Sequence, residues 1–427
     1  MIINYIFSKD DTYVAPNQDY LIDFFDSKTF SFTFWNALHK MNSWYNEKAL
    51  DLLYISFAVF AADRLIKRDT GHDNWSREIK LYIPVLNLNV WETNKKLLKE
   101  MLDFLSGDCW EFEFRQRKLT ILENIHKEKM LKSEEQIEEY DQVCMFSGGL
   151  DSFIGAIDLL ETGQTNILFI SHYGGGKGTK EYQDILKEKL IEKYDLNSKN
   201  FNQFFAKVVN GVEDTTRTRS FMFFSHAIAL ATMLNKQVDI VIPENGFISL
   251  NIPSTISRIG TSSTRTTHPY YLKLFQKLLD NLGLKIKLKN PYQFYTKGEM
   301  IINCKNIIFL NQNIANTMSC SHPDSGRMLG EKTTRHCGYC LPCVIRQASI
   351  KKAGIKDSSS YRDNKFNNTH VAKMNYNSYR LGLAKFEPKY AFLTIQKSGP
   401  ISDNIEKFSS IYIRGMEELE EYIKSIN

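Results

Sequence analysis

The chain has 427 residues, of which 43% are apolar and 24% are charged, proportions typical of a globular protein rather than of a disordered or fibrous chain. Its formal net charge of +5 fits an anionic ligand such as ATP and does not by itself indicate nucleic acid. The longest apolar run, 52–62, falls short of the ~20 residues that span a bilayer. We therefore expect it to form a buried helix, and we expect no membrane partner.

The cysteine content and the first ten residues indicate the cellular compartment in which the protein is expected. Seven cysteines are too few for a disulfide scaffold in a chain of this length and agree with a reducing compartment. The first ten residues lack a basic stretch followed by a long apolar core, so we expect no secretory signal and a cytoplasmic protein. Cys109, Cys144 and Cys304 follow no pattern, and we expect buried thiols.

Residues 1–140 are predicted to form an α+β accessory domain. Apolar residues between 97 and 105 repeat at helical spacing. Trp110, Phe112 and Phe114 then alternate with charged residues, as in a half-buried strand. The highly charged stretch 127–141 predicts a solvated helix or a linker into the next unit.

From residue 143 the pattern changes to short apolar runs separated by helix-length segments. The strand candidates are 143–146, 167–170, 204–209, 239–242 and 285–288. This rhythm predicts an α/β unit over 141–353, with a parallel sheet and helices on both faces. Ligands bind beyond the carboxyl ends of such strands, so the loops that follow them are candidate sites. Residues 354–427 predict a mostly helical C-terminal extension.

The loop after the first of these strands carries a chemical signature. Its sequence is Ser147-Gly148-Gly149-Leu150-Asp151-Ser152. Between a strand and a helix, backbone amides and the positive end of the helix dipole can hold an anion. The glycines allow close approach of a phosphate, the serine hydroxyls can donate hydrogen bonds, and Asp151 can orient the loop or hold Mg²⁺. The alternative is an ordinary serine and glycine turn capped by Asp151.

A second glycine-rich segment, 174–179, is similar to a Walker A loop without matching it. Lys177 is followed by Gly178 rather than by Ser or Thr, and Ser171 stands where that motif requires a glycine. These differences exclude a kinase or a GTPase of that type. Lys177 and Lys180 remain candidates to face the nucleotide or substrate.

Four cysteines have the spacing C-x16-C-x2-C-x2-C, namely Cys320, Cys337, Cys340 and Cys343. Four convergent thiolates complete the closed tetrahedral shell of a structural Zn²⁺, which leaves no open position for catalysis. The alternatives are an iron–sulfur cluster, a redox pair of Cys337 and Cys340, or the replacement of one sulfur by His322 or His336.

The phosphate loop resembles the signature of the PP-loop ATP pyrophosphatases, and its combination with the cysteines resembles the 7-cyano-7-deazaguanine synthase family, QueC. The segments that carry the second resemblance are Thr317-Met-Ser-Cys320 and Cys337-Gly-Tyr-Cys340-Leu-Pro-Cys343-Val-Ile-Arg346. Three shorter pieces agree: Ile170-Ser-His-Tyr173-Gly174, Arg217-Thr-Arg219-Ser220 and Tyr295-Thr-Lys297-Gly-Glu299-Met. The resemblance covers residues 142–352.

The resemblance implies an ATP-dependent ligase that forms carbon–nitrogen bonds. PP-loop enzymes hold the β and γ phosphates in this loop, transfer AMP to a substrate oxygen and release pyrophosphate. The synthase converts 7-carboxy-7-deazaguanine to an amide and then to a nitrile, with ATP and ammonia. ATP, Mg²⁺ and a structural Zn²⁺ are the implied cofactors, and a 7-deazaguanine is the implied small-molecule partner. Tyr173, Gly174 and Lys177 are then candidates for nucleotide binding together with 147–152.

Several departures from the family motifs point to a subtype. His172 replaces an aspartate, and the segments 243–247 and 264–269 differ from the usual tyrosine, proline and aspartate motif. The added residues on both sides resemble the QueC-like proteins of bacterial anti-phage systems, the Qat system's QatC and related CBASS components. For these the resemblance suggests that the activated deazaguanine is attached through an amide to the amino terminus of a partner protein of the same defence system. Nucleic acid is not expected as the primary ligand.

Two arginines ahead of an apolar helix are catalytic candidates. Arg217 or Arg219 could stabilise the charge that grows on the α-phosphate, and the alternative is helix solvation. Lys297 is a third candidate, whose alternative is a solvated helix start shared with Glu299.

Four other residues are candidates for substrate binding. Glu244 and Asn245 follow the strand 239–242, where Glu244 could bind Mg²⁺ or accept hydrogen bonds from a purine-like edge, and a plain turn is the alternative. Arg265 and His268 could bind substrate or phosphate. Because Pro269 suits a first helical turn, helix capping is their alternative.

Two other functions remain open from the sequence. One is a PP-loop enzyme that modifies RNA in the manner of a thiolase, which often needs an exposed reactive cysteine or a nucleic-acid domain. The other is an assembly protein that binds a nucleotide without turnover, against which the intact motif 147–152 argues.

Overall fold

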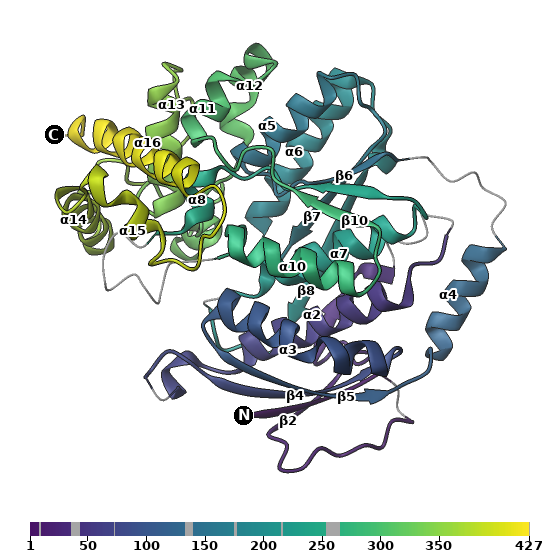
Figure 1. Ribbon diagram of the computed structural model, residues 1–427. Helices are drawn as coiled ribbons and strands as arrows, with labels where there is room; N and C mark the ends of the chain where they lie inside the picture. The colour runs from purple at the N-terminus through teal and green to yellow at the C-terminus, as the bar shows by residue number, and fades with distance from the viewer. Residues whose placement is uncertain are drawn as a thin grey trace.

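The structure of the protein is a computed structural model (Figure 1). It describes residues 1–7, 10–35, 43–71, 73–132, 140–174, 177–214, 217–252 and 265–426. In Figure 1 the N-terminal sheet lies at the bottom, the larger sheet in the middle and the C-terminal helices at the upper left. None of the described helices is long and apolar enough to cross a membrane.

The larger sheet has six strands in the order β10-β9-β6-β7-β8-β3. Five are mutually parallel and confirm the five predicted strands: β6 (Gln142–Met145), β7 (Ile167–Tyr173), β8 (Phe201–Val208), β9 (Val238–Val241) and β10 (Ile286–Lys289). The sixth, β3 (Phe30–Phe32), comes from the N-terminal region and pairs antiparallel with β8.

Helices cover both faces of this sheet. Alternate residues of β6 point to opposite sides, so Val143 belongs to one hydrophobic core and Cys144 to another. The Cys144 side is covered by α5 (Leu150–Leu160), α6 (Lys177–Tyr194), α11 (Lys297–Ile302) and α12 (Ile307–Asn313). The Val143 side is covered by α2 (Glu47–Leu65), α7 (Arg219–Thr232) and α10 (Pro269–Asn281). This arrangement confirms the predicted α/β fold.

The N-terminal sheet has four parallel strands in the order β2-β1-β4-β5. They are β1 (Ile2–Ile6), β2 (Tyr20–Asp23), β4 (Glu78–Val85) and β5 (Cys109–Gln116). β5 and the preceding helix α3 (Leu88–Ser106) confirm the strand and helix read from the sequence. The expected helix or linker over 127–141 is described in part, since α4 (Ile121–Leu131) ends before 133–139, which lie outside the described residues.

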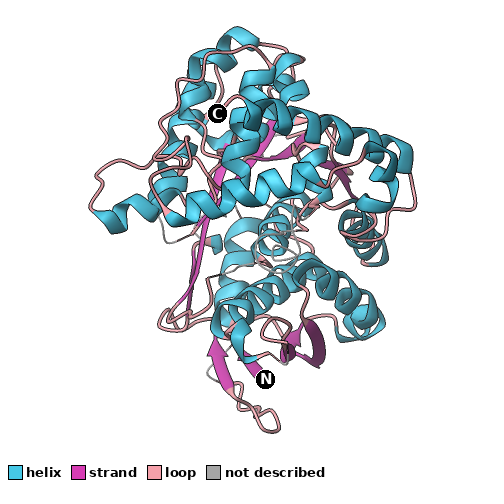
Figure 2. Cartoon of the chain, turned by 90° about the vertical axis from the view of Figure 1, so that its left-hand side faces the viewer, coloured by secondary structure: helices cyan, strands magenta, loops and turns pink. Residues whose placement is uncertain are grey.

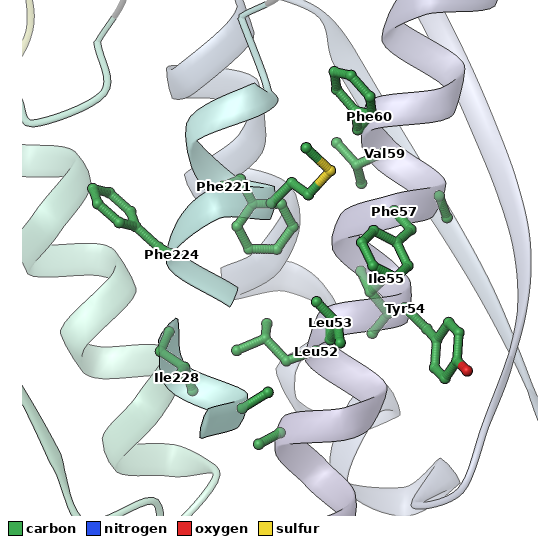
Figure 3. Packing of buried hydrophobic residues seen from close by; sticks show 14 of the residues in the cluster. Leu52, Leu53, Tyr54, Ile55, Phe57, Val59, Phe60, Phe221, Phe224 and Ile228 are labelled. Atoms are coloured by element: carbon green, nitrogen blue, oxygen red, sulfur yellow. The ribbon is translucent and has the colours of Figure 1, made fainter. Parts of the chain in front are cut away.

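The N-terminal region and the larger sheet share one hydrophobic core, and the expected boundary near residue 140 stays a prediction. α2 is buried on all sides, as the apolar run 52–62 predicted, and therefore needs cover around its whole circumference. α7 supplies part of that cover, with Phe221 and Ile228 on the helix beside α2 (Figure 3). The Phe57 ring of α2 lies 5.2 Å from the ring of His226 of α7. Together with β3, this places the N-terminal region and the larger sheet around one continuous core.

The C-terminal region is helical, as predicted. It consists of α14 (His370–Ala384), α15 (Ala391–Ile395) and α16 (Ile405–Lys424). α16 packs on α13 (Leu341–Lys352), which follows the cysteine segment, and on the short α8 (Gly246–Leu250), which follows β9. Figure 2 shows the C-terminus among helices, at the opposite end of the molecule from the N-terminus.

Short 3₁₀ helices complete the described elements. They are η1 (Arg68–Thr70), η2 (Ser198–Asn200), η3 (Ile314–Asn316), η4 (Pro323–Leu329) and η5 (Pro388–Tyr390). η3 and η4 lie on either side of Cys320, so the chain reaches the cysteine segment through short turns rather than through long helices.

Candidate active site

The serine and glycine loop connects β6 to α5, as predicted. Ser147 is exposed, and Gly148 has φ +82°, a left-handed conformation that favours glycine. A Cβ at Gly148 would lie 2.9 Å from Cγ of Gln183, so the space around the loop also requires glycine. The Ser147 and Ser152 hydroxyls lie 3.1 Å apart, and the Gly149 amide donates to Ser147 Oγ at 3.3 Å. These contacts give the loop a defined shape with Ser147 on its exposed side.

Two segments from elsewhere in the chain hold this loop. Gln183 of α6 donates from Nε2 to the carbonyls of Ser147 and His172, at 3.0 Å each. The Met318 amide donates to the Gly148 carbonyl at 2.8 Å. Met318 stands two residues before Cys320, so the cysteine segment directly supports the loop. No sequence pattern pointed to Gln183, since a glutamine inside a helix is usually an ordinary surface residue.

Four of the predicted site residues come together behind the loop. Asp151 lies 3.0 Å from the Lys297 ammonium, and its other oxygen accepts from the Asn245 backbone at 3.2 Å and from Asn245 Nδ2 at 2.6 Å. Burial alone would raise the pKa of Asp151, but Lys297 and the neighbouring hydrogen-bond donors hold it below its ordinary value. Burial and the charge of Asp151 raise the pKa of Glu244 well above its ordinary value. Of the two carboxyl groups, Glu244 is therefore the one that holds its proton more strongly.

Local capping explains the positions of Asn245 and Lys297. Asn245 is the N-cap of α8, with its Oδ1 accepting from the Ile248 amide. Lys297 is the first residue of α11, whose N-cap Thr296 forms a capping box with Glu299. Both caps follow strands at the carboxyl edge of the sheet, where ligands of parallel α/β folds bind.

The C-terminal helix α16 reaches this corner through Glu418, which the sequence analysis missed. Glu418 is buried and accepts a hydrogen bond from the Thr296 hydroxyl. A Cβ at Gly298 would lie 2.6 Å from its Oε1, so glycine is needed for this approach. Burial raises the pKa of Glu418 to about 7. A glutamate in a helix with many charged residues carries no sequence signal for such a contact.

The residues after β7 and at the start of α7 also lie at this edge. Arg219 is exposed, whereas His172 is buried, and burial together with the charge of Arg219 lowers the pKa of His172 well below its ordinary value. The Tyr173 ring packs 5.5 Å from Phe205. A Cβ at Gly174 would meet only open space, and the Lys177 side chain lies outside the described part of the chain.

The other three candidates contact different parts of the molecule. Arg217 donates from Nη1 to the Ser106 carbonyl at 3.3 Å, and Arg265 donates to the Phe104 carbonyl at 2.8 Å. His268 is fully buried at the N-cap of α10, where Nδ1 accepts from an amide at 3.2 Å and Nε2 lies 3.2 Å from Ser398 Oγ. Both ring nitrogens are thus occupied, which matches the capping alternative for His268 and leaves neither of them for a substrate.

The four clustered cysteines form a site that could bind zinc. All four Sγ atoms lie within 4.8 Å of one another, with Cys320 to Cys340 at 4.0 Å and Cys337 to Cys343 at 3.9 Å. A tetrahedron with zinc–sulfur bonds of about 2.3 Å has sulfur–sulfur edges of about 3.8 Å, so the arrangement fits the ion. His336 Nε2 lies 3.1 Å from the Thr317 carbonyl, as expected of a neighbour rather than a ligand.

The remaining cysteines differ from the prediction at one position. Cys144 and Cys304 are buried, as expected, but Cys109 is exposed. The alternation that places Trp110 and Phe112 inward also places Cys109 on the outward face of β5. The sequence therefore contained the signal for its exposure.

The fold and the site define a class: a parallel α/β protein with a phosphate-type loop after its first core strand and a four-cysteine cluster, consistent with a QueC-like PP-loop fold. The curated relatives agree with that class. A protein of Rickettsia prowazekii is 28% identical over 149 residues, which cover 34% of this chain and 56% of that protein. A protein of Sulfurovum sp. is 25% identical over 242 residues, covering 52% of this chain and 97% of the relative.

A third relative, from Methanococcus aeolicus, is 24% identical over 251 residues, covering 51% of this chain and 98% of its own. All three are named 7-cyano-7-deazaguanine synthase. The chain spans 56% of the Rickettsia prowazekii relative, and about half of the chain lies outside each match to the other two. No family model matches the chain. No solved structure matches it either.

Proposed function

We propose that this protein is an ATP-dependent ligase that adenylates the carboxylate of a 7-deazaguanine and then transfers the acyl group to nitrogen. The observation that carries the proposal is the loop 147–152, with Ser147 exposed at the carboxyl end of β6 and Asp151 bound to Lys297 behind it. The names of the relatives supply the substrate class. The activity requires that the loop hold a triphosphate with its α-phosphorus towards the carboxylate.

The proposed chemistry has two steps that balance. A carboxylate oxygen of the substrate attacks the α-phosphorus of ATP, the bond to the β-phosphate oxygen breaks, and pyrophosphate leaves. Ammonia or another amine then attacks the acyl carbon, AMP leaves with the electron pair, and the nitrogen loses a proton. In a second activation the amide oxygen attacks the α-phosphorus of another ATP and pyrophosphate leaves, after which AMP departs with loss of both N–H protons and gives the nitrile. The loop 147–152 would bind the β and γ phosphates, and Arg219 and Lys297 would stabilise the negative charge at the α-phosphate.

Asp151 and Glu244 are the proposed Mg²⁺ ligands. Both carboxyl groups accept from Asn245 Nδ2, so their oxygens lie close together, and carboxylate oxygens are ligands that Mg²⁺ prefers. Glu244, which is partly exposed, is also proposed to accept hydrogen bonds from the edge of the deazaguanine. Asn245 is fully buried with its amide group bound to Asp151 and Ile248, so it would position this site rather than contact the substrate. Tyr173, Gly174 and Lys177 complete the proposed nucleotide site, and the four cysteines are assigned to a structural zinc ion.

The nucleophile of the second step determines the product. Ammonia gives the amide and then the nitrile, whereas the amino terminus of a protein gives an amide conjugate. The long regions outside the matched half agree with a role in a bacterial anti-phage system, in which a partner protein receives the deazaguanine. This finer proposal rests on the resemblance of the sequence to QatC and to CBASS components.

The test uses the purified full chain with ATP, Mg²⁺ and 7-carboxy-7-deazaguanine, with and without ammonia or a candidate partner protein. We expect substrate-dependent release of pyrophosphate, followed by a nitrile or by a mass increase on the partner. Asp151→Asn should abolish the release. Asp158→Asn is the matched control on the same helix α5, because Asp158 binds Tyr292 and the Lys305 amide instead of the site residues. Absence of substrate-dependent pyrophosphate in the wild type would contradict the proposal.

An RNA-modifying PP-loop enzyme is the second candidate, because the structure exposes one thiol. If Cys109 carried sulfur to RNA, Cys109→Ser would abolish thiolation of a bound RNA. The ligase proposal predicts that Cys109→Ser leaves pyrophosphate release unchanged.

A further inference from the structure

A second cluster of cations lies where the N-terminal region meets the starts of α7 and α10. Arg217 stands just before α7 and Arg265 just before α10, and both donate to carbonyls at the C-terminal end of α3. Each guanidinium also covers an aromatic ring: Arg217 lies 4.6 Å from the centre of Trp75, and Arg265 lies 4.5 Å from that of Phe104. Neutral groups thus hold both cations in place.

The carboxylates of this junction are already occupied by other arginines. Arg68 and Arg77 bind both Asp63 and Asp108, with distances of 2.5 to 3.2 Å. Two carboxylates therefore balance two guanidiniums, and no ion pair to Arg217 or Arg265 occurs among the residues that the structure describes. The neighbouring stretches 215–216 and 253–264 contain no Asp or Glu in the sequence. The third acid of the junction, Glu213, accepts from the Arg68 amide, so Arg217 and Arg265 have no ion-pair partner of their own in the described structure.

Arg217 shows the cost of the missing ion-pair partner most clearly. Only 6% of its surface is exposed, and its Nη2 has no hydrogen-bond partner in the described structure. Burial first, and then the charges of Arg68 and Arg265, lower the pKa of Arg217 to about 10. A buried guanidinium with an unsatisfied N–H and cationic neighbours is costly unless an anion pairs with it. Because Arg265 is partly exposed, an anion can reach the pair from solvent.

We propose that Arg217 and Arg265 form an anion subsite, built jointly by the N-terminal region and the α/β unit, that binds a phosphate or carboxylate group of a ligand. The planar guanidinium suits both oxyanions, since it can donate two parallel hydrogen bonds to them. The N-terminal region thereby becomes part of the ligand-binding machinery. Trp75 and the carbonyls of Phe104 and Ser106 fix the two guanidiniums towards the anion.

The experiment titrates inorganic phosphate into the full-length protein at constant ionic strength and measures binding by calorimetry and the melting temperature. In the wild type, phosphate should bind and raise the melting temperature. Arg217→Met and Arg265→Met should each weaken phosphate binding at least tenfold. Arg217→Met should also melt no lower than the wild type without phosphate, because it removes an unpaired buried charge.

The matched control is Arg64→Met, since Arg64 lies in the same region but pairs with Asp214. This variant should bind phosphate like the wild type. Equal phosphate binding in all four proteins would overturn the proposal. So would a fall in the melting temperature of phosphate-free Arg217→Met, which would identify Arg217 as a purely structural residue.

Titrating phosphate in the presence of a non-hydrolysable ATP analogue identifies the source of the anion. Competition would assign the subsite to a phosphate of the nucleotide, and simultaneous binding would assign it to an anionic group on a second ligand. The double variant Ser147→Ala, Ser152→Ala separates this proposal from the proposed function. It should weaken binding of the ATP analogue while leaving the effect of Arg217→Met on phosphate binding intact.

Discussion

Two buried charge clusters in this molecule differ in how completely their carboxylates are satisfied. In the N-terminal region, every carboxylate oxygen of Asp63 and Asp108 accepts at least two hydrogen bonds. Asp63 also caps the start of α7, since one oxygen accepts from the Arg217 and Thr218 amides at 2.9 and 3.0 Å. This cluster connects the N-terminal region to the larger sheet and leaves its acids no capacity for a ligand.

The cluster behind the phosphate-type loop is incomplete by comparison. One oxygen of Asp151 has Lys297 as its ion-pair partner, and Glu244 accepts a long hydrogen bond from Asn245 Nδ2 at 3.4 Å. Two acids here face one lysine, and burial together with the charge of Asp151 raises the pKa of Glu244. A saturated network, in which every carboxylate oxygen is hydrogen-bonded, stabilises the fold. A network with open hydrogen-bonding positions can still bind a cation or a substrate.

The largest effect is expected at the cysteine cluster, whose sulfurs have the geometry of a cation site. Cys343→Ser removes one ligand, and structural zinc sites contribute on the order of 10 kcal/mol to folding of their segment. We expect about one zinc per chain in the wild type and none in the variant, by elemental analysis. ATP affinity should also fall, because Met318 of this segment holds the Gly148 carbonyl. Full ATP affinity in a zinc-free variant would show that the cysteine segment does not support the loop 147–152.

The saturated cluster should dominate stability. Asp63→Ala leaves two buried guanidiniums and the start of α7 without their acceptor, so it should lower the free energy of unfolding by about 3–5 kcal/mol. Urea denaturation measures this loss. The matched control is Asp403→Ala, an exposed acid paired with Lys273, which should change stability by less than about 1 kcal/mol. Equal losses in both variants would remove the distinction between the clusters.

The incomplete cluster should dominate activity. Lys297→Met should lower the rate of pyrophosphate release about 10² to 10³-fold, the usual loss when one charge-stabilising donor is removed. Its melting temperature should fall as well, because the buried Asp151 loses its ion-pair partner, so the rates are compared well below that temperature. Lys289→Met is the control on the neighbouring strand β10, where Lys289 pairs with Asp239. A rate unchanged in Lys297→Met would exclude this lysine from the mechanism.

Because of Glu244, we expect the free energy of unfolding to fall as the pH rises. A salt-bridged acid would make it rise instead. Its raised pKa means that the folded state holds more protons than the unfolded state once the pH exceeds the ordinary value of 4.5. Its contribution to the free energy of unfolding therefore falls as the pH rises above 4.5 towards the folded pKa. Glu244→Gln removes this fall, so the variant should gain stability relative to the wild type between pH 5 and pH 8. Glu188→Gln, at an exposed position, should show no such gain.

A smaller fall in the free energy of unfolding with rising pH is expected from Glu418. A folded pKa of about 7 against an ordinary 4.5 corresponds to at most ~3 kcal/mol, lost as the pH rises through that window. Glu418→Gln should be more stable than the wild type at pH 8 and nearly equal to it at pH 5, by urea denaturation. If the two proteins differ equally at both values, titration of Glu418 is not the cause.

The sequence predicted the elements better than their assembly. The five parallel strands were readable because strands buried on both faces appear as short apolar runs. The pairing of β3 with β8 could not be predicted, because three residues are too few to show an alternation of apolar side chains and the partner strand lies far along the chain. For the same reason, the capping of α7 by Asp63, 154 residues away, was invisible.

The residues of the candidate site likewise fall into those that the sequence predicted and those that it missed. Asp151, Glu244, Asn245 and Lys297 were identified from loops after predicted strands, and the structure brings them together because those loops share one edge of the sheet. Gln183 and Glu418 were missed, since each acts from the middle of a helix through side-chain contacts with residues far along the chain. The placement of Arg217 against Trp75 required the N-terminal region, whose packing the sequence did not reveal.

The central claim is that the loop beginning at Ser147 holds ATP while a carboxylate attacks its α-phosphorus. Exchange of labelled pyrophosphate into ATP measures that reversible step directly, without need of the final nucleophile. With 7-carboxy-7-deazaguanine present, the wild type should incorporate label into ATP and Asp151→Asn should not. Formation of ADP, or absence of label in ATP with the wild type under saturating substrate, would contradict the account.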